Sequence, residues 1–448
     1  MFKKILVANR GEIAVRLVQV IHELGAQAVV VYAEPDSDSM AVAMADTAVC
    51  IGPGPAAQSY LNMQNVLAAA VLTGAEAIHP GFGFLSESSD FAELCAQAGV
   101  VFIGPDALTI KQLGDKAQAR SLAARFDVPV IPGSQALQTL AQAQAAALTM
   151  GYPLMLKAAA GGGGKGIRMI EDEAALQALW QPAQQEAQAA FGDDAMYLEK
   201  VLRQAKHIEV QVLGDQAGHL WVFPERDCSL QRCKQKLIEI SPSLQLAATM
   251  RQQLQTYAQR LATGVHYQNA GTIEFLVDDS GVYFMEMNTR IQVEHPISEF
   301  VTGVELLRLQ IMIAAGEPLP GGSRVLAAHG VAIECRINAD VEGGADQITQ
   351  VRWPLGGAGV RVDTGITAGT KLTPYYDAML AKLIVHADSA ALAWRRLERA
   401  LGELKFQGVK TNVASQLALI ASPVVQAGGA TITYVEENDA QTTTSNAR

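Results

Sequence analysis

The sequence predicts an α/β protein with a parallel β-sheet at its N-terminus, followed by two regions of mixed α+β structure. In the first part of the chain, short apolar runs alternate with segments of helical periodicity, which is typical of parallel sheets. In the middle of the chain, strand-like segments follow one another with few helical segments between them. The length of 448 residues exceeds what one hydrophobic core normally supports, so about two to four domains are expected.

Residues 1–112 are expected to form the first domain. Residues 5–8 are a short apolar run, and apolar side chains then recur at helical spacing from Ile13 to Leu24, where Gly25 provides a stop. Further buried strands are predicted at residues 28–32, 49–51, 77–79 and 101–103.

Residues 113–330 are expected to form a second, mixed domain. It begins at Gly114-Asp115-Lys116 and includes an Ala/Gln-rich helix at residues 135–150, then a strand at residues 153–158 and a glycine run. Further strands are predicted at residues 195–198, 207–213, 220–224, 271–277 and 282–287.

Residues 331–434 are expected to form a third domain. It contains predicted strands at residues 331–337 and 382–386 and a predicted helix at residues 390–404. Residues 435–448 are polar and are expected to be a frayed tail.

The composition excludes several classes of protein. Hydrophobic residues make up 49% and charged residues 18% of the chain, which is a globular composition. The net charge of −11 disfavours a nucleic-acid or anionic-membrane partner. The five cysteines include no CxxC pair, which disfavours disulfides and a zinc site and indicates the cytoplasm. No apolar run is long enough to span a bilayer, and no signal peptide is expected.

A glycine run, Gly161–Gly164, lies between Lys157 and Lys165. Such a loop can bring several backbone N–H groups onto a phosphate, because no Cβ blocks the approach. It is not a Walker A loop, since Ala159 and Gly166 stand where that pattern needs Gly and Ser or Thr. The sequence favours a mobile phosphate lid, with a flexible linker as the alternative.

Polar side chains occupy every second position from Glu286 to Glu294, with the apolar Met287, Ile291 and Val293 between them. If this segment is extended, its polar side chains share one face. These are Glu286, Asn288, Arg290, Gln292 and Glu294. A hairpin through residues 278–281 would bring Glu274 beside Glu286. Glu274, Glu286 and Asn288 offer the hard oxygen ligands that suit Mg²⁺ or Mn²⁺ on nucleotide phosphates. The alternative is a half-buried strand with a solvated face.

Residues 225–236 form a dense polar segment in which Lys236 could hold an anion, with a solvated loop as the alternative. His79, His207 and His295 are expected to be structural or hydrogen-bonding residues, because no two histidines lie at metal-ligand spacing.

Together these motifs resemble the biotin carboxylase family of the ATP-grasp superfamily over nearly the whole chain. The motifs are ANRGEIAVR (8–16), HPGFGFLSE (79–87), GDK (114–116), GGGGKG (161–166), ERDCSLQR (225–232), EMNTRIQVEHP (286–296), ECRINA (334–339) and PYYDAMLAKLI (374–384). The resemblance implies a Rossmann-like N-terminal domain, an ATP-grasp domain with a mobile lid at about residues 131–202, and a mixed α+β C-terminal domain.

The resemblance also implies a reaction. ATP activates bicarbonate as carboxyphosphate, and biotin on a carrier protein is carboxylated, the first half-reaction of a multi-subunit carboxylase such as acetyl-CoA carboxylase. Glu294 matches the base, and Lys236, Arg290 and Arg336 match the groups that hold bicarbonate, with Gln292 and the Val293 backbone. Arg336 also matches the group that stabilises the biotin enolate. Phe82 falls near the biotin pocket.

By the same resemblance, ATP is bound by lysines, lid glycines, hinge residues and residues beside the adenosine. They are Lys116, Lys157, Gly163, Gly164, Glu199, Lys200, Leu202, His207, Gln231 and Lys234. Glu274, Glu286 and Asn288 match the ligands of Mg²⁺ or Mn²⁺. The implied partners are a biotin carboxyl carrier protein, carboxyltransferase subunits and a second copy of the chain in a homodimer. The final carboxyl acceptor is not indicated.

The sequence departs from the family pattern at the edge of the expected site. Lys234 replaces a histidine, Cys233 an arginine, Phe82 a tyrosine and Ala160 a lid glycine, and a loop is shortened at residues 343–347. The residues expected to bind metal and bicarbonate are complete, so we expect an active enzyme with altered nucleotide affinity. The alternatives are another ATP-grasp ligase and a catalytically silent nucleotide-binding paralogue.

Overall fold

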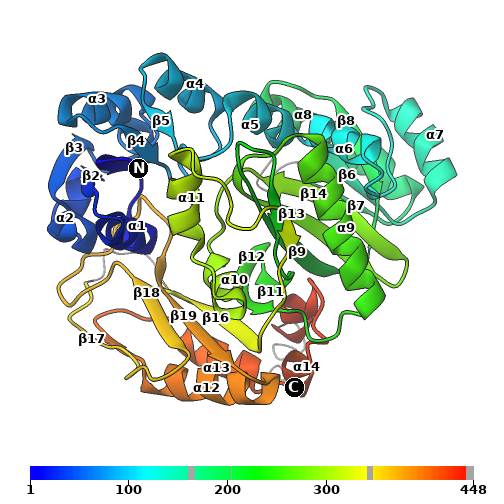
Figure 1. Cartoon of the computed structure of the whole chain (residues 1–448). Coiled ribbons are helices and arrows are strands. Elements are labelled where there is room, and N and C mark those ends of the chain that lie inside the picture. The colour runs from blue at the N-terminus through cyan, green and yellow to red at the C-terminus, as the bar shows by residue number, and fades with distance from the viewer. Residues whose placement is uncertain (160–166, 203, 341–346, 440–448) are drawn as a thin grey trace.

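The computed structural model describes residues 1–159, 167–202, 204–340 and 347–439. Figure 1 shows the N-terminal domain on one side, a large sheet in the centre, and a small unit around α7 and α8 on the opposite side. The lid glycines Gly163 and Gly164, the departure at Ala160 and most of the shortened loop at residues 343–347 lie outside the described residues.

The N-terminal domain is a five-stranded parallel sheet in the order β3-β2-β1-β4-β5, as predicted. Its strands are β1 (Lys4–Val7), β2 (Gln27–Ala33), β3 (Thr47–Gly52), β4 (Ala77–His79) and β5 (Val101–Phe102). Its helices are α1 (Gly11–Glu23), η1 (Glu34–Asp36), α2 (Met40–Met44), η2 (Ala56–Gln58), α3 (Met63–Thr73) and α4 (Ser89–Gln97). This is the Rossmann-like arrangement, and the strand order reverses between β1 and β4.

At that reversal, two loops are bound to each other. The side-chain amide of Asn9 donates to the carbonyl oxygens of Pro80 and Phe82, each at 2.7 Å. Phe82 itself is half-buried against the core of this domain. The loop that carries Phe82 and Glu87 is thereby fixed at the carboxyl ends of the strands, where open α/β sheets bind ligands.

A ten-stranded sheet forms the centre of the molecule, with the order β14-β13-β9-β11-β12-β16-β19-β18 and with β10 and β15 branching from β9. Its strands are β9 (Lys206–Gly214), β10 (Leu220–Val222), β11 (Arg226–Arg232), β12 (Gln235–Ser241), β13 (Asn269–Asp278), β14 (Gly281–Asn288), β15 (Arg324–Val325), β16 (Val331–Asn338), β18 (Val360–Thr364) and β19 (Met379–Ala387). The β12–β16 ladder continues the sheet from the second expected region into the third.

Helices cover this sheet through two hydrophobic cores. Apolar residues of α5 (Ala107–Gly114), α6 (Lys116–Arg125) and α9 (Ala248–Gly264) pack on β9, β13 and β14. Those of α12 (Ala390–Glu403), α13 (Val413–Ile420) and α14 (Pro423–Gln426) pack on β12, β16 and β19. The remaining elements here are α10 (His295–Thr302), α11 (Leu306–Ala314), β17 (Gln350–Arg352) and β20 (Lys405–Gln407).

A separate three-stranded antiparallel sheet, β7-β6-β8, occupies the region expected to be a lid. Its elements are α7 (Leu140–Met150), β6 (Leu154–Ala158), β7 (Arg168–Ile170), α8 (Glu173–Phe191) and β8 (Met196–Lys200). The helix predicted at residues 135–150 begins only at Leu140, because Thr139 and Gln142 form a capping box that sets its start.

One alternative is excluded and one expectation was wrong. Residues 225–236 are not a solvated loop, the alternative raised for them, but belong to the hairpin β11–β12, whose charged residues Arg226 and Asp227 are buried. Residues 435–439, expected to belong to a frayed tail, are helical, and Val435 is buried there. No helix among the described residues is long and apolar enough to cross a membrane.

Candidate active site

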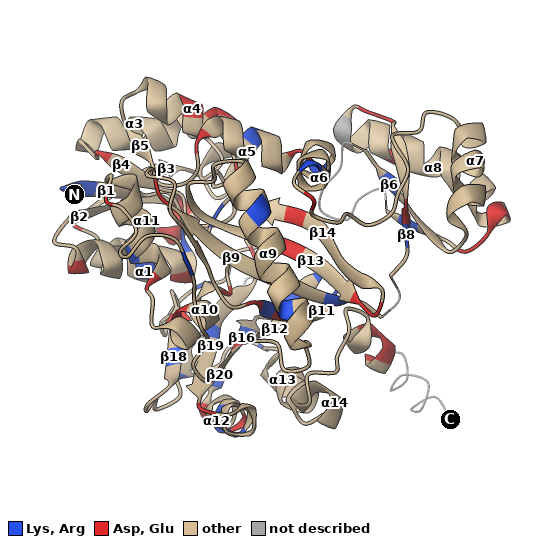
Figure 2. Ribbon diagram, turned by 45° about the vertical axis from the view of Figure 1, so that its right-hand side comes forward, with Lys and Arg blue, Asp and Glu red and all other residues tan. Residues whose placement is uncertain are grey.

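The hairpin β13–β14 brings the two expected acidic residues together. Glu274 lies directly opposite Glu286, which confirms the predicted hairpin. Asn288 ends β14, and its side-chain amide donates to Glu274 Oε1 at 2.8 Å. Figure 2 shows the acidic positions on β13 and β14 facing basic ones around β11 and β12 in the middle of the molecule.

The segment from Glu286 to Glu294 does not continue as a strand. The strand ends at Asn288, a turn follows, and helix α10 begins at His295. Pro296 explains the change, because proline favours the first turn of a helix. The turn nevertheless keeps Arg290 and Gln292 close to Asn288 and Glu274, since Arg290 Nη1 donates to Gln292 Oε1 at 2.9 Å and Gln292 Nε2 to Glu274 Oε1 at 3.1 Å.

Lys236 lies at the centre of the site. Its ammonium is bound by three carboxylates, at 2.6 Å from Glu209 Oε2, 2.6 Å from Glu294 Oε1 and 3.2 Å from Glu274 Oε1. A buried cation needs such partners, because its desolvation is costly without them. Sequence reasoning selected Lys236 and two of its partners but missed Glu209.

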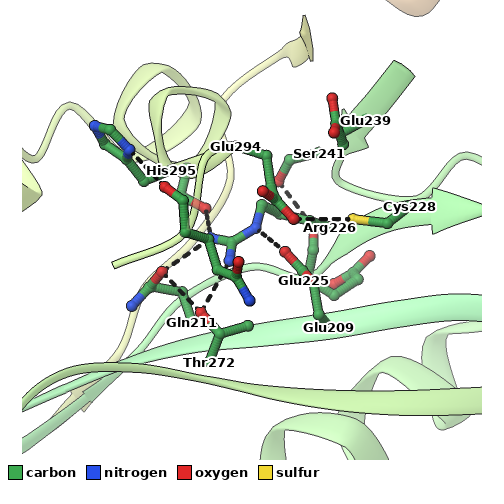
Figure 3. A network of polar contacts seen from close by, with 12 residues as sticks. Glu209, Gln211, Glu225, Arg226, Cys228, Glu239, Ser241, Thr272, Glu294 and His295 are labelled. Atoms are coloured by element: carbon green, nitrogen blue, oxygen red, sulfur yellow. Dashed lines mark hydrogen bonds and ion pairs between the residues drawn. The ribbon is translucent and has the colours of Figure 1, made fainter. Parts of the chain in front are cut away.

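Two arginines extend this cluster. Arg226 is fully buried and donates to Glu209 Oε1 at 2.5 Å, and to Gln211, Thr272 and Ser298. Figure 3 shows Arg226 in the middle of these side chains with Glu294 beside it. Arg336 bridges two carboxylates, with Nε at 2.7 Å from Glu239 and Nη2 at 3.0 Å from Glu294.

The pKa values of the acids in this cluster are shifted in opposite directions. Burial opposes ionisation of Glu294, but Lys236 and Arg336 outweigh burial and hold its pKa well below the usual range. Burial and the charge of Glu294 raise the pKa of Glu209. Burial raises the pKa of Glu239 to about 7, even though Arg336 opposes the shift. Glu294 is therefore an ionised carboxylate beside groups that titrate nearer neutrality, which is typical of acid–base sites.

The two lysines expected to contact the ATP phosphates also pair with carboxylates. Lys116 lies 3.3 Å from Glu286, and Lys157 forms an ion pair with Glu199, which Arg120 binds at 2.5 Å. The expected adenine-side residue Lys200 instead donates to the carbonyl oxygens of Met150 and Gly151 at 3.2 Å, and Leu202 is half-buried beside it in the chain. His207 Nε2 lies 3.0 Å from Glu274 Oε2.

The turn of the β11–β12 hairpin carries two of the departures. Cys233 and Lys234 both have positive φ, and Gln231 lies opposite Lys236 in this hairpin. The Cys233 N–H donates to Glu436 at 3.0 Å, so the C-terminal helical residues support the turn. Burial, followed by the charges of Lys157 and Lys116, lowers the pKa of Lys234. Lys234 therefore lies close enough to the other two lysines to be repelled by them.

Sequence reasoning missed Glu209, Arg226, Glu239 and Glu87. Glu87 accepts from Arg290 Nε at 3.0 Å and so links the N-terminal domain to the expected bicarbonate arginine. Glu209 had a signal, because charged and polar residues alternate with apolar ones in HIEVQV at residues 207–212. Glu239 lies between Ile238 and Ile240 on β12, so a charged residue interrupts an apolar run there.

The residues present fit a divalent cation bound to phosphates. Glu274 and Glu286 supply two carboxylates on adjacent strands, and Asn288 supplies an amide oxygen, which is the oxygen-rich set that Mg²⁺ prefers. His207, Glu209 and Glu274 also have ligand atoms within 4.8 Å of one another. That second group is a poorer cation site, because the Lys236 ammonium already contacts both of its carboxylates.

Comparisons with known proteins agree with this geometry. Residues 1–110 match the family model "Biotin carboxylase, N-terminal domain", residues 115–321 "Carbamoyl-phosphate synthase L chain, ATP binding domain", and residues 334–437 "Biotin carboxylase C-terminal domain". Biotin carboxylase 1 of Bacillus subtilis is 44% identical over 98% of this chain and 99% of its own.

Solved structures give the same result. The biotin carboxylase domain dimer of 2-oxoglutarate carboxylase from Hydrogenobacter thermophilus, in complex with MgADP, ADP and bicarbonate, is 44% identical, with a TM-score of 0.93 over 98% of each chain. Biotin carboxylase from Campylobacter jejuni is 41% identical, also with a TM-score of 0.93, over 98% of this chain and 99% of that one.

Proposed function

We infer that the cluster around Lys236 is the bicarbonate site of this protein. The premise is that the chain belongs to the biotin carboxylase family and catalyses the ATP-dependent carboxylation of biotin with bicarbonate. The single observation that carries this assignment is the triple contact of Lys236 with Glu209, Glu274 and Glu294 beside Arg336. A lysine and an arginine at one ionised glutamate can hold an anion and deprotonate it.

Glu294 is the proposed base. Its low pKa makes it a weak base while Lys236 and Arg336 bind it alone. Bicarbonate bound to the same two cations would share their charge, and the pKa of Glu294 would then rise toward the value that proton transfer requires. Lys236 and Arg336 thus keep Glu294 ionised before bicarbonate arrives, and they lower its pKa less once bicarbonate is bound.

Arg290, Gln292 and the Val293 backbone are the other proposed contacts of bicarbonate. Arg290 is oriented by Glu87 at 3.0 Å and by Gln292 at 2.9 Å. Arg336, fixed by Glu239, is the proposed group that stabilises the biotin enolate. Phe82, on the loop fixed by Asn9, is proposed to lie at the edge of the biotin pocket.

ATP is proposed to bind between the lid and the β13–β14 hairpin. Lys116, Lys157 and the lid glycines Gly163 and Gly164 would bind its phosphates. The adenosine would contact Glu199, Lys200, Leu202, His207, Gln231 and Lys234. Mg²⁺, held by Glu274, Glu286 and Asn288, would neutralise phosphate charge. Lys116 and Lys157 each pair with a carboxylate, so their ammonium groups are already oriented within the site.

The alternatives raised by the sequence are not favoured. Relatives such as biotin carboxylase of Haemophilus influenzae, 41% identical over 98% of this chain, extend the similarity along the full length. A different ATP-grasp ligase would not need the Arg290–Glu294 turn together with Arg336.

The assembly is proposed from the relatives. The small subunit of the 2-oxoglutarate carboxylase of Hydrogenobacter thermophilus is 44% identical to this chain, and the match covers 98% of this chain and 94% of that subunit. We propose a biotin carboxyl carrier protein, carboxyltransferase subunits and a second copy of this chain as partners. The five free cysteines suit the reducing cytoplasm as the compartment.

A steady-state assay tests the site. Wild-type enzyme should release ADP from ATP only when both bicarbonate and free biotin are present. Glu294→Gln should lower that rate at least about a hundredfold, since one preorganised group at the reacting centre contributes about 3 kcal/mol. Glu225→Gln is the control, because Glu225 is an equally buried glutamate that pairs with Arg251 outside the cluster. Equal loss in both variants would contradict the assignment.

A further inference from the structure

A second buried lysine lies beneath the bicarbonate turn. Lys382, on β19, is fully buried, and its ammonium donates to the carbonyl oxygen of Val293 at 2.9 Å. It also lies 3.1 Å from Glu12 Oε1 and 3.7 Å from Asp363 Oδ2. These partners come from three separate parts of the fold: helix α1, strand β18 and the turn before α10.

The position of the ammonium is set by rigid elements. Asp363 lies directly opposite Lys382 in the β18–β19 ladder. Arg361 holds the Asp363 carboxylate with two contacts of 2.7 Å. Glu12 is in the first turn of α1, where the helix dipole favours a carboxylate. The ammonium is therefore fixed from the side of the sheet and from the N-terminal domain.

The turn that it contacts has no ladder of its own. Residues 289–294 lie between the end of β14 and the start of α10. In this turn, the Gln292 carbonyl accepts hydrogen bonds from the backbone N–H of His295 at 3.3 Å and from its ring Nδ1 at 2.8 Å. Burial, followed by the charges of Lys382 and Arg361, holds the pKa of His295 well below its usual range. The ring is therefore neutral, and Nδ1 carries the proton that is donated to the Gln292 carbonyl. Side chains, not regular structure, decide the conformation of residues 292–295.

That conformation matters for the reaction. Gln292, the Val293 backbone and Glu294 are the proposed contacts of bicarbonate, and all three belong to the turn. A displacement of about 1 Å at such groups can cost about a hundredfold in rate. Fixing one carbonyl in the middle of the turn fixes the direction of the neighbouring N–H and of the Glu294 side chain.

We propose that Lys382 is a positioning residue for bicarbonate, which holds the turn of residues 292–295 through the Val293 carbonyl while Glu12 and Asp363 hold its ammonium. This proposal rests on the assignment of the turn to bicarbonate. It predicts a specific defect when Lys382 is removed: bicarbonate binding is lost, whereas ATP binding is kept.

The competing explanation is that Lys382 only neutralises buried acids. The charges of Glu12, Glu334 and Asp363 favour the charged form of Lys382, whereas Arg361 opposes it. Burial raises the pKa of Glu334 well above its usual value and also raises that of Glu12, although the charge of Lys382 opposes both shifts. A double variant separates the two explanations, because it can restore the charge balance without restoring the contact to Val293.

The experiment compares Lys382→Met with Glu12→Gln/Lys382→Met. Melting temperature and the KM values for bicarbonate and ATP are measured in biotin-dependent ADP release. We expect Lys382→Met to lower the melting temperature and to raise the KM for bicarbonate at least tenfold, with the KM for ATP changed less than twofold. The double variant should recover the melting temperature but keep the high KM for bicarbonate.

Lys206→Met is the matched control. Lys206 also donates to backbone carbonyls, those of Gly428 at 2.5 Å and Ala430 at 3.0 Å, and pairs with Asp227 at 3.1 Å. It should lower the melting temperature without changing the KM for bicarbonate.

Recovery of both properties in the double variant would overturn the proposal, as would a parallel rise of both KM values in all three variants. A wild-type enzyme without bicarbonate-dependent turnover would instead contradict the function assigned to the turn.

Discussion

Removal of the Lys236 charge is the most direct test of the electrostatic cluster. In Lys236→Met, three buried carboxylates lose a cation that lies 2.6, 2.6 and 3.2 Å from them. Breaking a buried ion pair typically costs about 3–5 kcal/mol of unfolding free energy. Protonation of one carboxylate sets an upper limit to this loss. Neutralising a glutamate with a normal pKa at pH 7 costs about 4 kcal/mol, so the variant is expected to lose about 3–4 kcal/mol of unfolding free energy and to take up a proton.

The activity of Lys236→Met should change in two ways. Loss of one preorganised cation at the anion costs about 3 kcal/mol, or about a hundredfold in kcat/KM for bicarbonate. The acidic limb of the pH profile should also move toward higher pH, because Lys236 is the largest of the groups that keep the pKa of Glu294 low. The folded-state pKa of Glu294 lies below its unfolded value, so its stabilising contribution is present above the unfolded pKa and is lost as pH falls.

The assay is biotin-dependent ADP release measured from pH 5.5 to 9, together with urea unfolding at the same pH values. Arg251→Met is the control, because it breaks a 2.8 Å ion pair with the buried Glu225 outside the cluster. An acidic limb and a KM for bicarbonate that stay at wild-type values in Lys236→Met would refute the reasoning. An equal shift in Arg251→Met would refute it as well.

Three further changes test other parts of the site. Lys234→His should raise the KM for ATP about fivefold at low salt, because it removes about 1 kcal/mol of charge attraction, and should leave the KM for bicarbonate unchanged. A KM for ATP that does not depend on salt in either protein would contradict this. Glu286→Gln should raise the Mg²⁺ concentration needed for half-maximal rate at least tenfold, and a magnesium titration at saturating ATP would show whether it does. Glu239 has a folded pKa of about 7, above its unfolded value, so the folded state retains a proton that the unfolded state releases and wild-type stability falls as pH rises between these values. Glu239→Gln should flatten that part of the curve in urea unfolding at pH 5 and pH 8, and an unchanged difference would count against the assignment.

Much of the fold could be predicted because its signals are local. The alternation of β1, α1 and β2 follows from hydrophobic period alone, and the Asp278–Gly281 turn specifies the β13–β14 hairpin. The β11–β12 hairpin was missed for a physical reason. Arg226 and Asp227 are consecutive charged residues of β11 that are both buried, and their ion-pair partners lie on another strand, so the segment resembles a solvated loop.

The site was predictable in part for the same reason. Glu274, Glu286 and Asn288 lie on one hairpin, so their proximity follows from pairing of neighbouring strands. Glu209 on β9, Glu239 on β12 and Glu87 in the turn before α4 reach the site from other elements, and no local pattern indicates that these elements come together. The dense polar segment at residues 225–236 suggested Lys236 as a group that could hold an anion, and the family resemblance selected Arg336, which periodicity would not have selected.

By itself, the sequence determined the parallel N-terminal sheet, the acidic hairpin and the membership of a biotin carboxylase family, since these depend on spacing along the chain. Only the tertiary structure decided which carboxylates share Lys236, in which direction the pKa of each is shifted, and that Lys382 reaches the Val293 carbonyl. Charge interactions depend on distance and burial, and both arise only when β9, β12, β13, β19 and α1 are brought together.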